Sequence, residues 1–411
     1  MPSCVSLFSG VGGLDYGLEQ AGFDVVFAND LCPRAADTYK ANICRMNPPR
    51  PGRETTFAGC RVVEGDIGEL ADREFAEYFG VDLVAGGPPC QPFSSAGKQL
   101  GLDDPRGTLY EQFLRVVDTV RPKAVLFENV RGIVTARGES NRPGEVLYRL
   151  VAGFQRLGYG VSVGLLNAAD FGLPQRRVRF FLMGVRGGCG PEFPRPTHGK
   201  DGSPLPWVPL SSILYDERDF VRWTDENGVA RCEAKYATES QQAQLSQVEV
   251  GKGVRSKGLA EPTRPGGHWG YKQGMFVADP MLPARTITGS ATQDWIRMPD
   301  GRHRRLICRE AVLAQGFPLR WEFHPNNAVF WKQVGNAVPP VFGRVLGECL
   351  IKALEEHVSC EAPVSRPFPA HITSAITNTV RDSLRNGSVR PRSRRAEDVD
   401  GGEAEAISAQ V

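Results

Sequence analysis

Short apolar runs recur through the first half of the chain, separated by glycine turns and by stretches with helical spacing. Each run spans four to ten residues, a length typical of buried strands. The runs occupy residues 3–8, 23–28, 61–64, 81–85, 124–127, 158–167 and 178–185. Residues 14–21, 109–120 and 341–356 are predicted to be helices, and in the second of these one face carries Leu109, Phe113, Val116, Val117 and Val120. Strands that alternate with helices predict an α/β fold built on an open sheet.

Glycine and acidic residues follow the first three predicted strands. The turn at residues 9–13 leads directly into a helix, an arrangement that lets a ligand approach backbone N–H groups and a helix N-terminus. Its spacing is not the dinucleotide pattern GxGxxG, because the third glycine comes one place early. Asp30 ends the second strand, where a carboxylate can accept hydrogen bonds from ribose hydroxyls or simply cap the strand. Asp66 follows the third strand in the same way.

A cysteine emerges from a rigid turn after the run at residues 81–85. The stretch GGPPCQPFS, residues 86–94, stops the strand abruptly, and Pro88 and Pro89 restrict the backbone just before Cys90. Ligands bind at this end of strands in open α/β sheets, so an exposed, fixed thiol there suits a nucleophile. A buried structural cysteine in a proline-rich turn is the alternative.

Two further groups of charged residues follow later strands. Glu128 comes directly after the run at residues 124–127 and is expected at the same sheet edge as Cys90. Arg177 and Arg179 alternate along a predicted strand, so their guanidiniums should project from one face toward an anionic or polar ligand. A solvated strand-end glutamate and an exposed basic strand are the alternatives.

The character of the chain changes after about residue 186. Prolines and scattered aromatic residues replace the alternating pattern, and no long helical pattern is present up to residue 281. Basic residues gather in 251–272 and 297–309, which favours contacts with phosphates. Residues 358–411 are rich in Ser, Pro and Arg and then become acidic, so we predict a disordered tail.

The overall composition adds three bounds. The net charge of the 411 residues is +2, too balanced to indicate a nucleic-acid partner by itself. No apolar run approaches the ~20 residues of a membrane span. The ten cysteines include no CxxC pair and no zinc-like spacing, so we predict no metal site.

The blocks PPCQPFS, FSGVGGL, ENV, QxRxR, RLICREAVLAQGFP and QVGNAVPP together resemble the DNA cytosine-5 methyltransferases of bacterial type. They occur in the family's order from Phe8 to Pro340. The resemblance implies an S-adenosylmethionine-dependent, Rossmann-like α/β sheet with a smaller, mostly β and loop target-recognition domain. Residues 1–185 would form the catalytic and cofactor-binding domain, 186–300 the target-recognition domain, 301–357 a return segment completing the catalytic domain, and 358–411 the tail.

The resemblance also implies roles for the candidate residues. Cys90 would add to C6 of cytosine through a covalent adduct, which makes C5 reactive toward a methyl donor. Glu128 would contact N3 and the exocyclic amine and stabilise the protonated ring. Arg177 would hold the ring carbonyl or assist the thiolate, with Arg179 holding nearby groups. Because C6 is inaccessible in a stacked duplex, the cytosine must be flipped out.

The implied cofactor is S-adenosyl-L-methionine, and no metal is needed. The positions that match the family's cofactor pocket are Phe8, Gly10, Gly12, Asp30, Asp66, Ile67, Leu109, Asn336 and Val338. The expected partner is double-stranded DNA, with a cognate restriction endonuclease as an optional one. We expect a monomer in the bacterial cytoplasm, associated with the nucleoid and not with a membrane.

Three other functions remain open at this stage. One eukaryotic branch of the family acts on tRNA cytosine, although the long proline-rich recognition region favours duplex DNA. A catalytically inactive DNA-binding relative would not need Cys90, Glu128 and Arg177. A nicotinamide dehydrogenase would share only the glycine turn and Asp30, and would leave PPCQPFS unexplained.

Overall fold

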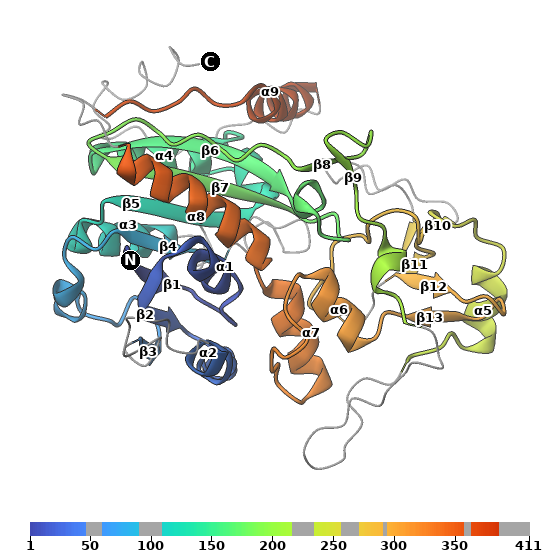
Figure 1. The fold of residues 1–411 in the computed structure, drawn as a ribbon. Helices are drawn as coiled ribbons and strands as arrows, with labels where there is room; N and C mark the ends of the chain where they lie inside the picture. Colours follow the sequence, from blue (N-terminus) through green and yellow to red (C-terminus); the bar gives the residue numbers. More distant parts are fainter. Residues whose placement is uncertain are drawn as a thin grey trace.

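A seven-stranded sheet forms the centre of the molecule (Figure 1). The computed structural model describes residues 1–46, 60–89, 109–215, 234–255, 271–290, 294–356 and 363–385. The strand order is β3-β2-β1-β4-β5-β7-β6, and the bounds are β1 (Ser3–Leu7), β2 (Asp24–Asp30), β3 (Arg61–Glu64), β4 (Leu83–Gly86), β5 (Ala124–Val130), β6 (Tyr159–Asn167) and β7 (Val178–Arg186). β1 to β5 are parallel, whereas β7 is antiparallel to both neighbours. The predicted strands and the α/β class are confirmed.

The strand order reverses beside β1. The chain proceeds from β1 to β2 and β3 on one side, and then returns to place β4 and β5 on the other. Such a reversal leaves a crevice at the carboxyl ends of the two strands that flank it. The glycine turn after β1 and the Gly-Gly-Pro-Pro turn after β4 both lie at this switch point.

Helices cover both faces of the sheet (Figure 1). One apolar cluster packs α1 (Gly13–Ala21), α2 (Pro33–Met46) and α8 (Pro340–Glu355) on one face, and the other packs α3 (Leu109–Val120), α4 (Glu145–Arg156) and α9 (Ala370–Arg385) on the opposite face. Within β4, Leu83 and Ala85 join the first cluster and Val84 the second, as strand alternation requires. In the described part of the chain, no helix is long and apolar enough to cross a bilayer.

Glycines let α1 and α8 approach closely, although they are far apart in the sequence. A Cβ on Gly17 would lie 1.9 Å from the Pro340 carbonyl oxygen, and one on Gly343 would lie 2.1 Å from the Leu14 carbonyl oxygen. Any side chain at either position would push the helices apart. The predicted helix near residues 341–356 therefore does return to the first helix.

A smaller region of short strands and loops lies beside the sheet (Figure 1). Its elements are β8 (His198–Gly199), β9 (Leu205–Pro206), α5 (Glu239–Leu245), β10 (Gly253–Arg255), β11 (Tyr271–Phe276), β12 (Trp295–Arg297) and β13 (His303–Arg305). α6 (Cys308–Ala314) and α7 (Asn327–Asn336) then connect it to α8. The boundary expected at residue 300 lies between β12 and β13, the two paired strands of one hairpin.

The arginines of residues 297–309 have partners within the protein, and they differ in burial: Arg304 and Arg305 are buried, whereas Arg297 and Arg302 are exposed. Three guanidinium carbons lie 3.7–4.8 Å from ring centroids: Arg302 over Tyr236, Arg305 over Trp295 and Arg309 over Tyr215. Arg304 is buried against Glu310, and Arg297 donates to carbonyl oxygens of Leu245 and Val248. Most of the other basic run, 251–272, lies outside the described residues.

The predicted disorder of residues 358–411 is wrong for residues 363–385. Val364 forms a parallel bridge with Cys189, and the Arg366 N–H donates to the Val161 carbonyl oxygen at 2.8 Å. α9 buries Ile372 and Ile376 in the second apolar cluster. Two isoleucines one helical turn apart provide the apolar surface that the polar average composition conceals.

Candidate functional site

The turn that leads to Cys90 is held against the end of β5. A Cβ on Gly87 would lie 2.6 Å from Glu128 Oε2, so any larger residue would require this carboxylate to shift. Asn129 Nδ2 donates to the Pro88 carbonyl oxygen at 3.3 Å. Cys90 itself lies outside the described residues. The described chain thus brings Pro89, the residue before it, to the sheet edge that carries Glu128.

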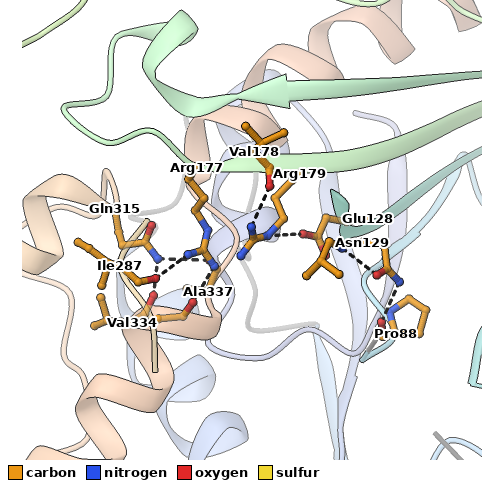
Figure 2. A network of polar contacts seen from close by, with 12 residues as sticks. Pro88, Glu128, Asn129, Arg177, Val178, Arg179, Ile287, Gln315, Val334 and Ala337 are labelled. Carbon is orange, nitrogen blue, oxygen red and sulfur yellow. Dashed lines mark hydrogen bonds and ion pairs between the residues drawn. The ribbon is translucent and has the colours of Figure 1, made fainter. Parts of the chain in front are cut away.

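Glu128 and Arg179 form an ion pair across β5 and β7 (Figure 2). Arg179 Nε lies 3.2 Å from Glu128 Oε1, and Arg179 Nη1 donates to the Val178 carbonyl oxygen at 2.9 Å. Burial raises the pKa of the Glu128 carboxyl above its usual value, and the charges of Arg179 and Arg177 only partly oppose this. The pair therefore offers a carboxyl that binds a proton more readily than an exposed glutamate, beside a fixed cation.

Arg177 takes partners different from those of Arg179, contrary to the expectation that both guanidiniums serve one ligand. Its side chain is fully buried and donates to the carbonyl oxygens of Ile287, Gly335 and Ala337 at 2.8, 2.7 and 3.0 Å. Figure 2 shows it directed away from Glu128, toward Ile287 and Ala337. Burial and the nearby Arg179 charge lower its pKa. Arg179 is thus the arginine that forms an ion pair with the Glu128 carboxylate.

The glycine turn after β1 has a backbone that few other sequences permit. Phe8, Gly10 and Gly12 have φ values of 54°, 56° and 85°, in the left-handed region. A Cβ on Gly12 would lie 2.5 Å from Ile43 Cδ1, and Gly12 caps the N-terminus of α1. The non-glycine Phe8 in this conformation is typical of strained backbone at ligand sites.

Asp30, at the end of β2, binds the backbone of the same turn. Its two carboxylate oxygens accept hydrogen bonds from the N–H groups of Gly10 and Cys32, each at 2.8 Å. Burial raises the pKa of Asp30, and these two bonds partly counter the rise. The Gly65 N–H donates to the Asp30 carbonyl oxygen at 3.1 Å, which draws the end of β3, and with it Asp66, to this edge.

The residues at this crevice fit a cationic nucleoside cofactor. Among the described residues, a Cβ on Gly10 or Gly65 would meet no atom within 4 Å, so space is open above both. Asp30 and Asp66 supply acceptors for hydroxyl or amino groups and attract positive charge, whereas they would repel a phosphate. These properties match the ribose, adenine and sulfonium of S-adenosylmethionine.

The remaining predicted cofactor residues differ in burial and in what they contact. A Cβ on Gly13 would lie 2.1 Å from the Val338 carbonyl oxygen, so the last block packs directly on the glycine turn. Asn336 is exposed two residues earlier. Leu109 is half-buried against the apolar cluster that contains Ile67, and Ile67 is itself buried.

Two asparagines that the sequence analysis missed position these strand ends. Asn29 is buried, and its Nδ2 donates to the carbonyl oxygens of Val63 and Gly65, each at 3.1 Å. Asn129 holds Pro88 in the way described above. Asn29 directly precedes Asp30, and Asn129 directly follows Glu128. This position next to a strand-end acid was the only signal available in the sequence.

Residues 3–352 match the family model of the C-5 cytosine-specific DNA methylases. Among curated relatives, the type II methyltransferase M1.HphI of Haemophilus parahaemolyticus is 31% identical, over 85% of this chain and 86% of its own length. The type II methyltransferase M.NgoMIV of Neisseria gonorrhoeae is also 31% identical, over 86% of this chain and 98% of its own.

Solved structures show the same fold. A putative DNA modification methyltransferase encoded within a prophage (E. coli) aligns with a TM-score of 0.62 and 22% identity, covering 87% of this chain and all of that one. The Dnmt2 methyltransferase of S. pombe aligns with a TM-score of 0.59 and 19% identity, covering 86% of this chain and 99% of that one. At these identities the likeness concerns the fold alone.

Proposed function

This chain belongs to the family of C-5 cytosine-specific DNA methylases, and from that membership we propose that Cys90, Glu128 and Arg179 act on the target base. The enzyme transfers a methyl group from S-adenosylmethionine to C5 of cytosine in DNA. One observation supports the residue assignment most directly: the Glu128–Arg179 pair lies beside the turn that leads into Cys90.

The proposed chemistry begins with Cys90. Its thiolate forms a bond to C6, and the C5–C6 π electrons move toward C5. Glu128 donates a proton to N3, which neutralises the charge that the addition places on the ring. When bound, S-adenosylmethionine supplies an electrophilic methyl group on its sulfonium. After C5 has been methylated, a base removes the C5 proton and the C6–S bond breaks, which restores the Cys90 thiolate, while N3 returns its proton to the Glu128 carboxylate.

Glu128 and Arg179 support this step through their environment. A raised pKa lets Glu128 keep its proton at a higher pH than an exposed glutamate would. Arg179 orients the carboxyl through its Nε, and its guanidinium offers further N–H groups that can donate to the ring carbonyl of a flipped cytosine. This assignment gives Arg179 the role that the sequence analysis gave Arg177.

The test is to express the chain in a host whose DNA lacks 5-methylcytosine and to sequence the genome for that base. We expect methylation at one defined sequence with the wild type and none with Cys90→Ser. Cys189→Ser, at an exposed cysteine, is the matched control and should methylate normally. Purified Cys90→Ser should still bind DNA, because phosphate and groove contacts lie elsewhere. Substantial turnover by Cys90→Ser would refute the nucleophile assignment.

The recognised sequence is proposed to be set by residues 186–284. The catalytic pocket holds one flipped base, so the neighbouring bases, which stay stacked, must be read by groove contacts. The short strands and loops of this segment lie beside the sheet and contain none of the residues proposed to act on the target base. Grafting this segment into a relative of known specificity should transfer the target sequence of this chain. An active chimera that keeps its host's target would contradict the assignment.

Duplex DNA is the substrate of the family, and three finer statements are part of the proposal. We propose that the enzyme is a monomer, that it works in the cytoplasm at the nucleoid, and that a cognate restriction endonuclease shares its target sequence. Sedimentation of the purified protein tests the first statement. Digestion of unmethylated host DNA by lysates of the source cells tests the last.

A further inference from the structure

Residues 284–289, here called the connector, join the recognition region to the sheet. On the sheet side, the Ala284 N–H donates to the Pro174 carbonyl oxygen at 2.9 Å, and the Arg176 N–H donates to the Ala284 carbonyl oxygen at 2.8 Å. The Ile287 N–H donates to Oε1 of the fully buried Gln175 at 2.8 Å. The connector is therefore fixed, residue by residue, to the loop just before β7.

The connector also presses on the end of α7. A Cβ on Gly335 would lie 2.2 Å from both the Thr288 carbonyl carbon and the Gly289 nitrogen. Gly335 is followed by Asn336, Ala337 and Val338, and the Val338 carbonyl oxygen lies against the glycine turn at Gly13. A displacement of the connector would therefore reach the cofactor crevice through close backbone contacts.

Arg177 bonds to both sides of this contact at once. Its Nη1 donates to Ile287 in the connector, and its Nη2 donates to Gly335 and Ala337 at the end of α7 (Figure 2). Two residues further along, Arg179 holds Glu128. The Arg177 guanidinium would lose hydrogen bonds if β7, the connector or the end of α7 moved alone. These three segments should therefore move together.

We propose that Arg177 is a positioning residue that couples the seating of the recognition region on DNA to the cofactor crevice and to the Glu128–Arg179 pair. This proposal rests on the function proposed above, because it takes 336–338 as the edge of the cofactor site. Arg177 does not touch the cytosine in this scheme. It makes binding of the target sequence and binding of S-adenosylmethionine favour each other.

The experiment measures that coupling directly. The dissociation constant of S-adenosylmethionine is determined by calorimetry without DNA and with a short duplex that carries the methylated sequence mapped in the host genome. For the wild type we expect the duplex to tighten cofactor binding by a factor within the ~5–150-fold range usual for coupled sites. For Arg177→Met the factor should fall to about one. Arg177→Lys should be intermediate, because it keeps the charge but not the fork of donors.

Two further variants separate coupling from general damage. Gly335→Ala leaves Arg177 in place but forces the connector away from α7, so it should also lower the factor. Arg304→Lys alters another fully buried arginine, whose ion pair is with Glu310 of α6, and should keep the wild-type factor even where the protein is less stable.

The outcomes are distinct. If the duplex tightens cofactor binding in Arg177→Met by the wild-type factor, the proposal is overturned, whether or not kcat falls. If kcat falls while this factor stays at the wild-type value, Arg177 acts on the base instead. Equal loss of coupling in Arg304→Lys would also overturn it, since any buried arginine would then suffice. A wild-type protein that methylates no DNA would instead refute the function on which the proposal rests.

Discussion

The sheet domain and the recognition region are stabilised in different ways. The sheet domain buries two large apolar clusters, one on each face, with aromatic and branched side chains from helices and strands. The described part of the recognition region has two small clusters, one around Leu210, Ala284 and Ile296 and one of Leu245, Val277 and Trp295. It adds arginines stacked on aromatic rings and a buried Arg304–Glu310 pair.

The difference shows what each region can tolerate. Apolar burial is non-directional, so the sheet can support polar groups at its strand ends without depending on them for stability. Where the recognition region joins α6, Glu310 of α6 accepts from Arg304 at 2.7 and 2.8 Å and from the N–H groups of Tyr215 and Ile307 at 3.0 and 2.9 Å. Charged groups are therefore part of its core, and each has a fixed position.

Removing one member of the buried pair should give the largest change in stability. Glu310→Ala leaves the Arg304 charge buried without its partner, so we expect a loss of about 3–5 kcal/mol in the free energy of unfolding. Glu348→Ala, which breaks an exposed pair with Arg344 on α8, should cost no more than ~0.5 kcal/mol. Urea unfolding measures both. Equal effects of the two substitutions would abolish the contrast between the regions.

A core substitution in α9 tests whether this C-terminal helix belongs to the sheet domain. Ile376 is 7% exposed and packs against Gly144, so Ile376→Ala should cost about 2–4 kcal/mol. Val380→Ala, on the exposed side of the same helix, should change stability by less than ~0.5 kcal/mol. Two small and equal effects would show that α9 is dispensable for the fold, and deletion of residues 361–411 would then be harmless.

A buried carboxylate of the sheet domain, held by two hydroxyl groups, can be compared with the buried Arg304–Glu310 pair. Asp15 is fully buried and accepts hydrogen bonds from Ser6 Oγ and Tyr39 Oη, each at 2.8 Å. Burial raises its pKa from 3.8 to about 6, and the two hydroxyls partly oppose the rise. Because the folded state binds this proton more tightly than the unfolded state, the Asp15 contribution to stability is largest below pH 4 and is lost as pH rises through 6.

Asp15→Asn should remove this dependence on pH. Between pH 8 and pH 4, the stability of the wild type relative to Asp15→Asn should rise by up to ~3 kcal/mol, as two pKa units imply. Thermal unfolding at several pH values provides the measurement. If the stability difference between the wild type and Asp15→Asn stays constant over this range, the pKa of Asp15 is the same in the folded and unfolded states. The sheet core around Asp15 would then be more polar than its apolar clusters suggest.

The sheet was predictable because its strands are short, apolar and bounded by glycine or acidic residues. The bounds of β3 and α3 agree with the sequence prediction, whereas α2 was not predicted and α9 was taken for disorder. α9 contains many Ser and Thr residues, and its two buried isoleucines are visible as a pattern only once a surface exists for them to cover. Local periodicity therefore predicted the elements whose apolar content is high.

The site was only partly predictable for a related reason. Glu128 and Arg179 were both expected at the site, but their pairing depends on β7 entering the sheet antiparallel between β5 and β6, which no local pattern specifies. The arginines of residues 297–309 resemble a phosphate-binding run in sequence, yet three of them stack on rings brought from other segments. Charge alone does not tell whether an arginine points outward.

The close packing of α1 on α8 has a consequence for synthesis of the protein. The first helix emerges early from the ribosome, but the backbone against which Gly13, Gly17 and Leu14 pack belongs to residues 338–343. In the nascent chain, the face of α1 that packs on α8 stays uncovered until most of the chain has been translated. Contacts between residues so distant in sequence are slow to form, so α8 completes the domain that α1 began.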